Sequence, residues 1–140
     1  MTVQSAINAE YLPHDDEPFM CDRQKAFFRQ RLQELKREIL DESRETVEAM
    51  QESAANISDL VDRASAEADR ALELRTRDRQ RKLIAKIDEA LRRIDTGEYG
   101  YCEETGEPIS LRRLIARPTA TLSLEAQERH ERREKIHRDE

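Results

Sequence analysis

The sequence Asn56-Ile57-Ser58-Asp59-Leu60-Val61-Asp62-Arg63-Ala64 decides how the rest of this chain folds. It separates two long charged segments in which apolar residues recur every three or four positions. This spacing places one apolar stripe along each of two helices. Two such helices joined by a short polar break are expected to form an antiparallel hairpin, stripe against stripe. The upstream stripe contains Phe27, Phe28, Leu32, Leu35, Ile39, Leu40, Val47 and Met50, and the downstream stripe contains Leu83, Ile84, Ile87, Leu91 and Ile94.

The composition favours a thin helical seam over a thick globular core, because 40% of the 140 residues are charged and only 4% are aromatic. A net charge of −6 argues against nonspecific binding to nucleic acid or to an anionic membrane surface. The sequence has neither an apolar run near the roughly 20 residues that span a bilayer nor a signal peptide, so we expect a cytoplasmic protein. In that reducing compartment we expect no disulfide between Cys21 and Cys102.

The expected fold is mainly α, and the chain divides into four parts. Residues 1–20 form a flexible or loosely packed leader. Residues 21–97 form a long antiparallel coiled-coil hairpin with its tip near residues 55–64. Residues 98–122, which contain turn-forming glycine and proline, form a small globular module. Residues 123–140 form a C-terminal helix.

The helix boundaries follow from capping and stop signals. The first helix is expected to begin with Asp22 as its N-cap and to end near Ser53. The second is expected to begin near Asp62 or Arg63 and to end at about Thr96, before Gly97. Ser123 is the expected N-cap of the last helix. Two residues of the leader, Tyr11 and Phe19, are expected to anchor it to the body of the protein. Four apolar residues are expected to form the core of the module: Ile109, Leu111, Leu114 and Ile115.

Three segments carry a resemblance to a known family: Leu72-Glu73-Leu74-Arg75, Tyr99-Gly100-Tyr101-Cys102, and the run from Leu111 to Ala120 that contains Arg117-Pro118-Thr119-Ala120. Together with the Asp-x-x-Asp-x-Ala tip they resemble the DksA/TraR family, and within it the DksA type with a long hairpin. The resemblance implies a monomeric bacterial transcription factor that binds RNA polymerase and not promoter DNA. The hairpin would enter the secondary channel and modulate initiation with guanosine tetraphosphate (ppGpp) in the stringent response, repressing ribosomal RNA promoters and activating amino-acid promoters.

The tip residues that the resemblance assigns to this activity are Asp59, Asp62 and Ala64. Carboxylates on a thin arm act strongly on a catalytic centre from which water is partly excluded. Ala64 would allow a close approach because it is small. The alternative interpretation is that Asp59 and Asp62 are an ordinary turn residue and an N-cap residue, which are common uses of aspartate.

The resemblance also implies a ppGpp contact formed with polymerase by Arg79, Leu83, Lys86 and Arg117. Basic side chains suit a pyrophosphate, although each alone is more often a solvated surface group. The chain departs from the family at Gln127, where a further lysine is usual. A neutral amide at that position is expected to weaken nucleotide binding.

A second departure concerns zinc, which most family members bind through four cysteines. The corresponding residues here are Cys102, Thr105, Ser123 and Ala126. A structural zinc site needs four nitrogen or sulfur ligands, so we expect no zinc and no cofactor held by the chain alone. The Thr105 and Ser123 hydroxyls are expected to help close the module by hydrogen bonding across this region.

The remaining thiol, Cys102, is either a redox sensor or an inert buried side chain. No Lys or Arg flanks it, and Glu103 and Glu104 are expected to raise its pKa, which favours the inert interpretation.

Three other classes of protein are alternatives to the polymerase factor. Catalysis is not expected, because His14, His130 and His137 are scattered and no phosphate-binding glycine loop is present. A self-associating structural coiled coil would show the same apolar stripes. A transcript-cleavage factor would carry a similar arm with an acidic tip.

Overall fold

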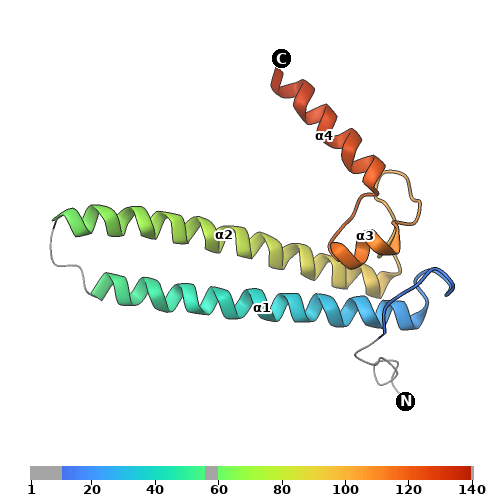
Figure 1. The fold of residues 1–140 in the computed structure, drawn as a ribbon, viewed down its shortest axis with the longest axis horizontal. Coiled ribbons are helices and arrows are strands. Elements are labelled where there is room, and N and C mark those ends of the chain that lie inside the picture. The colour runs from blue at the N-terminus through green and yellow to red at the C-terminus, as the bar shows by residue number, and fades with distance from the viewer. Residues whose placement is uncertain (1–10, 56–59, 140) are drawn as a thin grey trace. The chain divides into compact units, whose positions relative to one another are not determined.

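The computed structural model describes residues 11–55 and 60–139, and it confirms a mainly helical fold (Figure 1). Four helices follow one another within these described ranges: α1 (Asp22–Ala55), α2 (Leu60–Thr96), α3 (Leu111–Ala116) and α4 (Leu124–Asp139). Within the described residues there is no strand, and the only sheet-like contact is an isolated antiparallel bridge between Tyr101 and Pro108.

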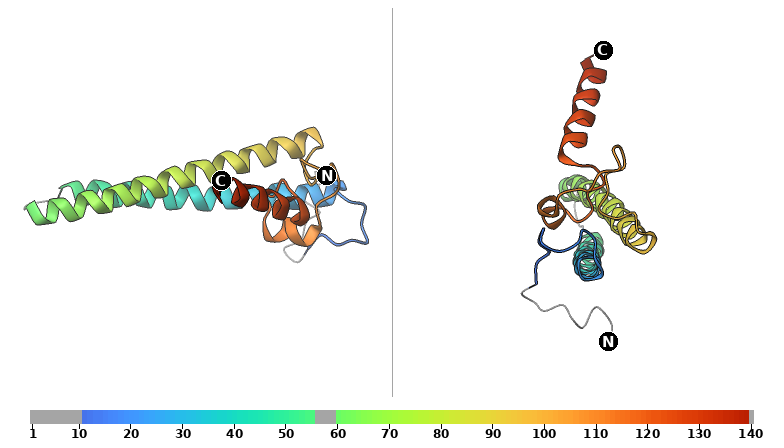
Figure 2. Two further views of the ribbon diagram at one scale, coloured as in Figure 1. Left: turned by 90° about the horizontal axis from the view of Figure 1, so that it is seen from above. Right: turned by 90° about the vertical axis from the view of Figure 1, so that its right-hand side faces the viewer.

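The described residues form two compact units. Unit 1 contains residues 11–32 and 89–139, and unit 2 contains residues 33–55 and 60–88. In each unit a stretch of α1 lies beside an antiparallel stretch of α2, as the apolar stripes predict (Figures 1 and 2). Ion pairs join the helices in both units, Arg29 to Asp95 in unit 1 and Lys36 to Asp88 at 2.7 Å in unit 2.

Two predicted helix starts are corrected. Asp22 is the first helical residue of α1 and not its N-cap. Helix α2 begins at Leu60, so Asp62 is its third residue. The reason is that the sequence from Leu60 to Asp62 contains no Gly or Pro that would prevent a helix from starting there. The turn residues 56–59 lie outside the described residues.

The stop signal at the end of α2 is confirmed. Gly97 has a φ of 82°, the left-handed conformation that glycine adopts most easily. The Glu98 amide donates to the Arg93 carbonyl at 2.9 Å, and the Gly97 amide donates to the Ile94 carbonyl at 3.3 Å. These two bonds form a Schellman motif, which pairs carbonyls that the helix end would leave free.

The core of unit 1 is built around Phe28, whose side chain is completely buried. Its ring centroid lies 5.2 Å from that of Phe27 and 5.5 Å from that of Tyr99. Burial disfavours the charged phenolate form of Tyr99 and therefore raises the pKa of this side chain. The Tyr99 hydroxyl donates a hydrogen bond to the Pro118 carbonyl at 2.7 Å. The predicted module core is confirmed for Ile109, Leu111 and Leu114, which are buried, whereas Ile115 is partly exposed.

Both predicted leader anchors pack on unit 1. Tyr11 meets Phe27 edge to face at 6.0 Å, and Phe19 meets Tyr101 in the same way at 5.4 Å. Gly100 has a φ of 90°, and a Cβ there would lie 3.2 Å from side-chain atoms of Phe19 and Met20. A glycine is therefore required where the leader crosses the module.

Helix α3 is an element that the sequence analysis missed. Ser110 caps it, since its side chain accepts a hydrogen bond from the Arg113 amide. A helix of six residues is too short to show an apolar period, and only the serine before Leu111 signals it. None of the helices within residues 11–55 and 60–139 is long and apolar enough to cross a membrane.

Replacing Phe28 with Ala is expected to lower the free energy of unfolding by about 3–5 kcal/mol, because it opens a cavity in the core of unit 1. Phe27→Ala is the matched control: this ring is partly exposed, so it should cost roughly half as much. Denaturant unfolding followed by circular dichroism measures both values. Equal losses for the two variants would contradict this description of the core.

Candidate functional site

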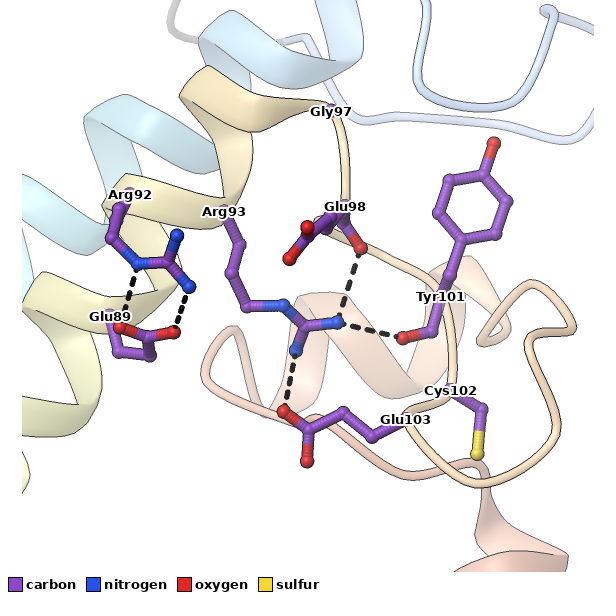
Figure 3. Close-up of a pocket in the computed structure, with 8 residues that line it drawn as sticks. All are labelled: Glu89, Arg92, Arg93, Gly97, Glu98, Tyr101, Cys102 and Glu103. Carbon is purple, nitrogen blue, oxygen red and sulfur yellow. Dashed lines mark hydrogen bonds and ion pairs between the residues drawn. The ribbon is translucent and has the colours of Figure 1, made fainter.

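A buried cation, Arg93, ties the end of α2 to the module. Its side chain is 8% exposed and donates to the Glu98 and Tyr101 carbonyls at 3.2 and 3.1 Å. The Glu103 carboxylate lies 3.5 Å from the same guanidinium (Figure 3). A buried charge needs such partners, because leaving water without them is costly. Arg93 is thus a structural residue that closes the module on the helix.

A pocket of about 450 Å³ lies beside Arg93 in unit 1, and Figure 3 shows the residues that line it. Its two cations already have partners: Arg92 pairs with Glu89, and Arg93 pairs with Glu103. The described residues that line the pocket therefore offer no unpaired cation to a phosphate ligand.

Cys102 is 2% exposed, and its surroundings favour the thiolate. Burial alone raises the pKa, but hydrogen bonds from the Ser123 amide, the Thr105 hydroxyl and the Thr105 and Glu104 amides outweigh it and lower the pKa to about 6. The expectation of a raised pKa is therefore wrong, because backbone amides decide it and not the flanking glutamate charges. The low pKa favours the sensor interpretation of Cys102, whereas its burial restricts access by oxidants.

The residues at the four zinc-ligand positions do not fit a zinc ion. Cys102 supplies one sulfur, while the Thr105 and Ser123 hydroxyls accept hydrogen bonds from the Glu107 and Ala126 amides. Ala126 has no ligand atom and is fully buried. A tetrahedral structural site needs four nitrogen or sulfur ligands. Within the described part of the chain, no three His, Cys, Asp or Glu side chains are grouped to hold a metal.

The Thr105 hydroxyl forms the expected hydrogen bond across the module, but the Ser123 hydroxyl does not. Thr105 bonds to the Cys102 sulfur, but Ser123 reaches it through its backbone amide, while the Ser123 hydroxyl caps α4. The expected N-cap at Ser123 is thereby confirmed. The module is closed further by Arg113, whose Nε donates to the Leu122 carbonyl at 2.9 Å, and by the Glu103 amide, which donates to the Thr121 carbonyl at 2.9 Å.

The three predicted tip residues are described only in part. Asp59 lies outside the described residues, and Asp62 is described only as a helical position near the start of α2. Ala64 follows in the same helix and is exposed. Their predicted role at a polymerase active site stays a prediction.

Three of the predicted nucleotide contacts share one face of α2. Arg79, Leu83 and Lys86 stand four and three residues apart, a spacing that places them side by side on a helix, and all three are exposed. Arg117 is an exposed residue of unit 1 and forms the C-cap of α3. Gln127 donates to the Glu131 carboxylate within α4 at 3.1 Å, so its amide is engaged inside the chain.

Sequence reasoning missed two buried glutamines. Gln24 is fully buried and well paired, since it accepts from the Met20 amide at 2.8 Å and donates to the His14 carbonyl at 3.2 Å. Gln80 is 7% exposed, and its Oε1 has no hydrogen-bond partner. The position of Gln80 in the sequence could have indicated its burial, because it lies three and four residues before Leu83 and Ile84 of the predicted apolar stripe.

The Cys102 thiol is expected to ionise with a midpoint near pH 6, well below its ordinary pKa of 9.0. Because the folded-state pKa is lowered, the thiolate's contribution to stability is fully present above pH 9, falls as the pH drops, and is absent below about pH 6. The ultraviolet difference spectrum between the wild type and Cys102→Ser, recorded against pH, isolates this thiolate from Cys21. A midpoint at or above 9 would contradict the hydrogen-bonding arrangement.

Comparison with known proteins gives consistent results along the chain. Two protein-family models match it: the N-terminal domain of DnaK suppressor protein DksA over residues 24–94, and the prokaryotic dksA/traR C4-type zinc finger over residues 97–132. The zinc-finger match extends over a segment that holds only one of the four cysteines.

Individual relatives are similar over most of the chain. The RNA polymerase-binding transcription factor DksA of Caulobacter vibrioides is 68% identical over 94% of this chain and 93% of its own length. The Escherichia coli protein of the same name is 44% identical, over 88% of this chain and 83% of its own.

The solved structure of transcription factor DksA2 from Pseudomonas aeruginosa has a TM-score of 0.79 and 44% identity, over 86% of this chain and 95% of that one. These relatives are named as transcription factors, which agrees with the prediction that the chain is not an enzyme. The helical pairing of α1 and α2, the module that follows, and the similarity along nearly the whole length show that the chain belongs to the DksA/TraR family.

Proposed function

We propose that this protein is a transcription factor that binds bacterial RNA polymerase, inserts the α1–α2 hairpin into the secondary channel and modulates initiation. The observation that carries the proposal is the 68% identity, over 94% of the chain, to a protein named as an RNA polymerase-binding transcription factor. The net charge of −6 supports a protein partner in place of direct DNA binding, since DNA-binding surfaces are basic.

The tip residues Asp59, Asp62 and Ala64 are proposed to act near the polymerase active site. A carboxylate there would interact with cationic side chains or metal-bound water, and the interaction is strong where water is partly excluded. The exposure of Ala64 supports a close approach by the start of α2. The protein is proposed to work as a cytoplasmic monomer, because stretches of α1 and α2 pair within one chain and bury residues such as Ile87.

The face formed by Arg79, Leu83 and Lys86 is proposed to contact ppGpp together with polymerase and Arg117. The physical support is that these cations are exposed, so they can meet a phosphate without first breaking a buried contact. Gln127 supplies no charge and is bonded to Glu131, so we propose weaker nucleotide potentiation than in relatives with a lysine there.

The module is proposed to fold without zinc. Arg93, Arg113 and the hydrogen bonds received by Cys102 join the same segments that a metal would join. Such a factor would keep its activity when zinc is scarce.

The decisive test of the function is transcription in vitro from a ribosomal RNA promoter with purified bacterial polymerase, with and without ppGpp. The wild type should inhibit, and Asp62→Asn should lose most of the inhibition because it removes the tip charge. Asp69→Asn is the matched control, since it removes an exposed carboxylate from the same helix. Absence of inhibition by the wild type at saturating concentration would overturn the proposal.

Zinc independence has a separate test. Metal analysis of the purified protein should find no stoichiometric zinc, and a chelator should leave the melting temperature unchanged, because metal that stabilises a fold lowers stability when it is removed. A chelator-induced fall in melting temperature would show that the module does use a metal.

A further inference from the structure

We propose that a groove on unit 2 is a docking site for an arginine side chain of a protein partner, separate from the tip and from the nucleotide-contact face. The groove has a volume of about 480 Å³ and lies between α1 and α2. The residues that line it include Glu42, Glu45 and Thr46 of α1 and Leu72, Glu73 and Gln80 of α2. The inference rests on the proposed function, because the partner to which it applies is RNA polymerase.

The charges of the groove are unbalanced. Glu42, Glu45 and Glu73 all line it, and none of the described residues that line it is Lys or Arg. None of these three carboxylates has an ion-pair partner among residues 11–55 and 60–139. Glu73 and Arg77 stand four residues apart on α2, a spacing that favours an ion pair, yet the structure does not form one. The groove thus presents negative charge that the described part of the chain leaves uncompensated.

A second, independent observation comes from Gln80. Its side chain lines the same groove, and the residue is only 7% exposed. Its Oε1 has no hydrogen-bond partner. The two threonine hydroxyls nearby are already used, since Thr46 donates to the Glu42 carbonyl and Thr76 donates to the Leu72 carbonyl. Buried acceptors are normally paired, as Gln24 is in unit 1, so the site lacks a donor.

The chemistry of this site selects a guanidinium among cationic ligands. A ligand must satisfy carboxylates on both helices and the amide oxygen of Gln80 on α2, and the planar guanidinium has five N–H donors in a fixed fork. Its apolar stem can lie along Leu72, which is 60% exposed at the groove. A metal ion is disfavoured, because the described residues contain no group of three His, Cys, Asp or Glu placed to hold one. The Gln80 oxygen is covered by its neighbours, so the docking side chain reaches it through rotation of the Gln80 side chain, which has three rotatable bonds.

The test compares two charge-matched variants of the full chain for affinity to purified bacterial RNA polymerase, measured by fluorescence anisotropy. The groove variant carries Glu42→Gln, Glu45→Gln and Glu73→Gln. The control variant carries Glu38→Gln, Glu48→Gln and Glu67→Gln, which removes three exposed carboxylates from the same two helices outside the groove. The groove variant should bind about tenfold more weakly and with less dependence on salt, whereas the control should stay within about twofold of the wild type.

A third variant, Gln80→Leu, tests the amide. Filling the site with an apolar side chain should raise the melting temperature and still weaken polymerase binding by several-fold, on the order of one hydrogen bond to a charged group. A merely structural role in helix pairing would change the melting temperature and leave binding unchanged, which would overturn the assignment of Gln80.

The outcomes separate this inference from the proposed function. If the wild type binds polymerase and the groove and control variants bind equally well, the docking site is refuted and the polymerase factor stands. If the wild type itself does not bind, both are refuted. Because glutamine is close in shape to glutamate, the Glu→Gln variants should keep the fold, and circular dichroism must show that their helix content is unchanged. The single variants Glu45→Gln and Glu73→Gln, each expected to weaken binding by about twofold to threefold, repeat the test if the triple variant loses helix.

Discussion

Unit 1 depends on the hydrogen bonds and the ion pair that the buried guanidinium of Arg93 makes. The guanidinium lies at the carboxyl end of α2, where the helix dipole favours a positive charge, and it is held by the Glu98 and Tyr101 carbonyls and the Glu103 carboxylate. Such a charge is tolerable only while all its partners are present, because an unpaired buried ion is far costlier than a paired one. This one side chain therefore holds the segment from Glu98 to Glu103 against the end of α2.

The same reasoning explains how a segment that matches a C4-type zinc finger can be closed with a single cysteine. A metal joins distant turns by coordinating them at one point. Here several contacts share this role: Arg93 holds one turn, and Arg113 and the Glu103 amide hold the loop before α4. Cys102 accepts hydrogen bonds from both segments that carry the zinc-ligand positions. Family membership thus specifies the fold of the module and not the means of closing it.

The helices could be predicted from the sequence because their signals are local and repeated. The apolar period defined α1 and α2, Gly97 gave the end of α2, and Ser123 gave the start of α4. What could not be predicted depends on the tertiary environment. Arg93 looked like any solvated charge near a helix end, and the pKa of Cys102 depends on amides whose approach only the fold reveals. The two buried glutamines show the same limit: Gln24 and Gln80 are equally polar in sequence, but the structure pairs the Gln24 side chain and leaves the Gln80 Oε1 without a hydrogen-bond partner.

The division of the described chain into two units bears on the order in which the protein is made. Unit 2 is formed from neighbouring stretches of sequence, whereas unit 1 joins residues 11–32 to residues 89–139. A ribosome releases the chain from its N-terminus, and domains usually fold as units during synthesis. The antiparallel pairing in unit 2 can therefore form first, while Phe19 and Met20 must wait for Gly100 and Tyr101 to emerge. Pairing in unit 2 would shorten the effective loop between residues 11–32 and residues 89–139. The helices that are synthesised first would thereby lower the entropic cost of assembling unit 1, whose second segment is synthesised last.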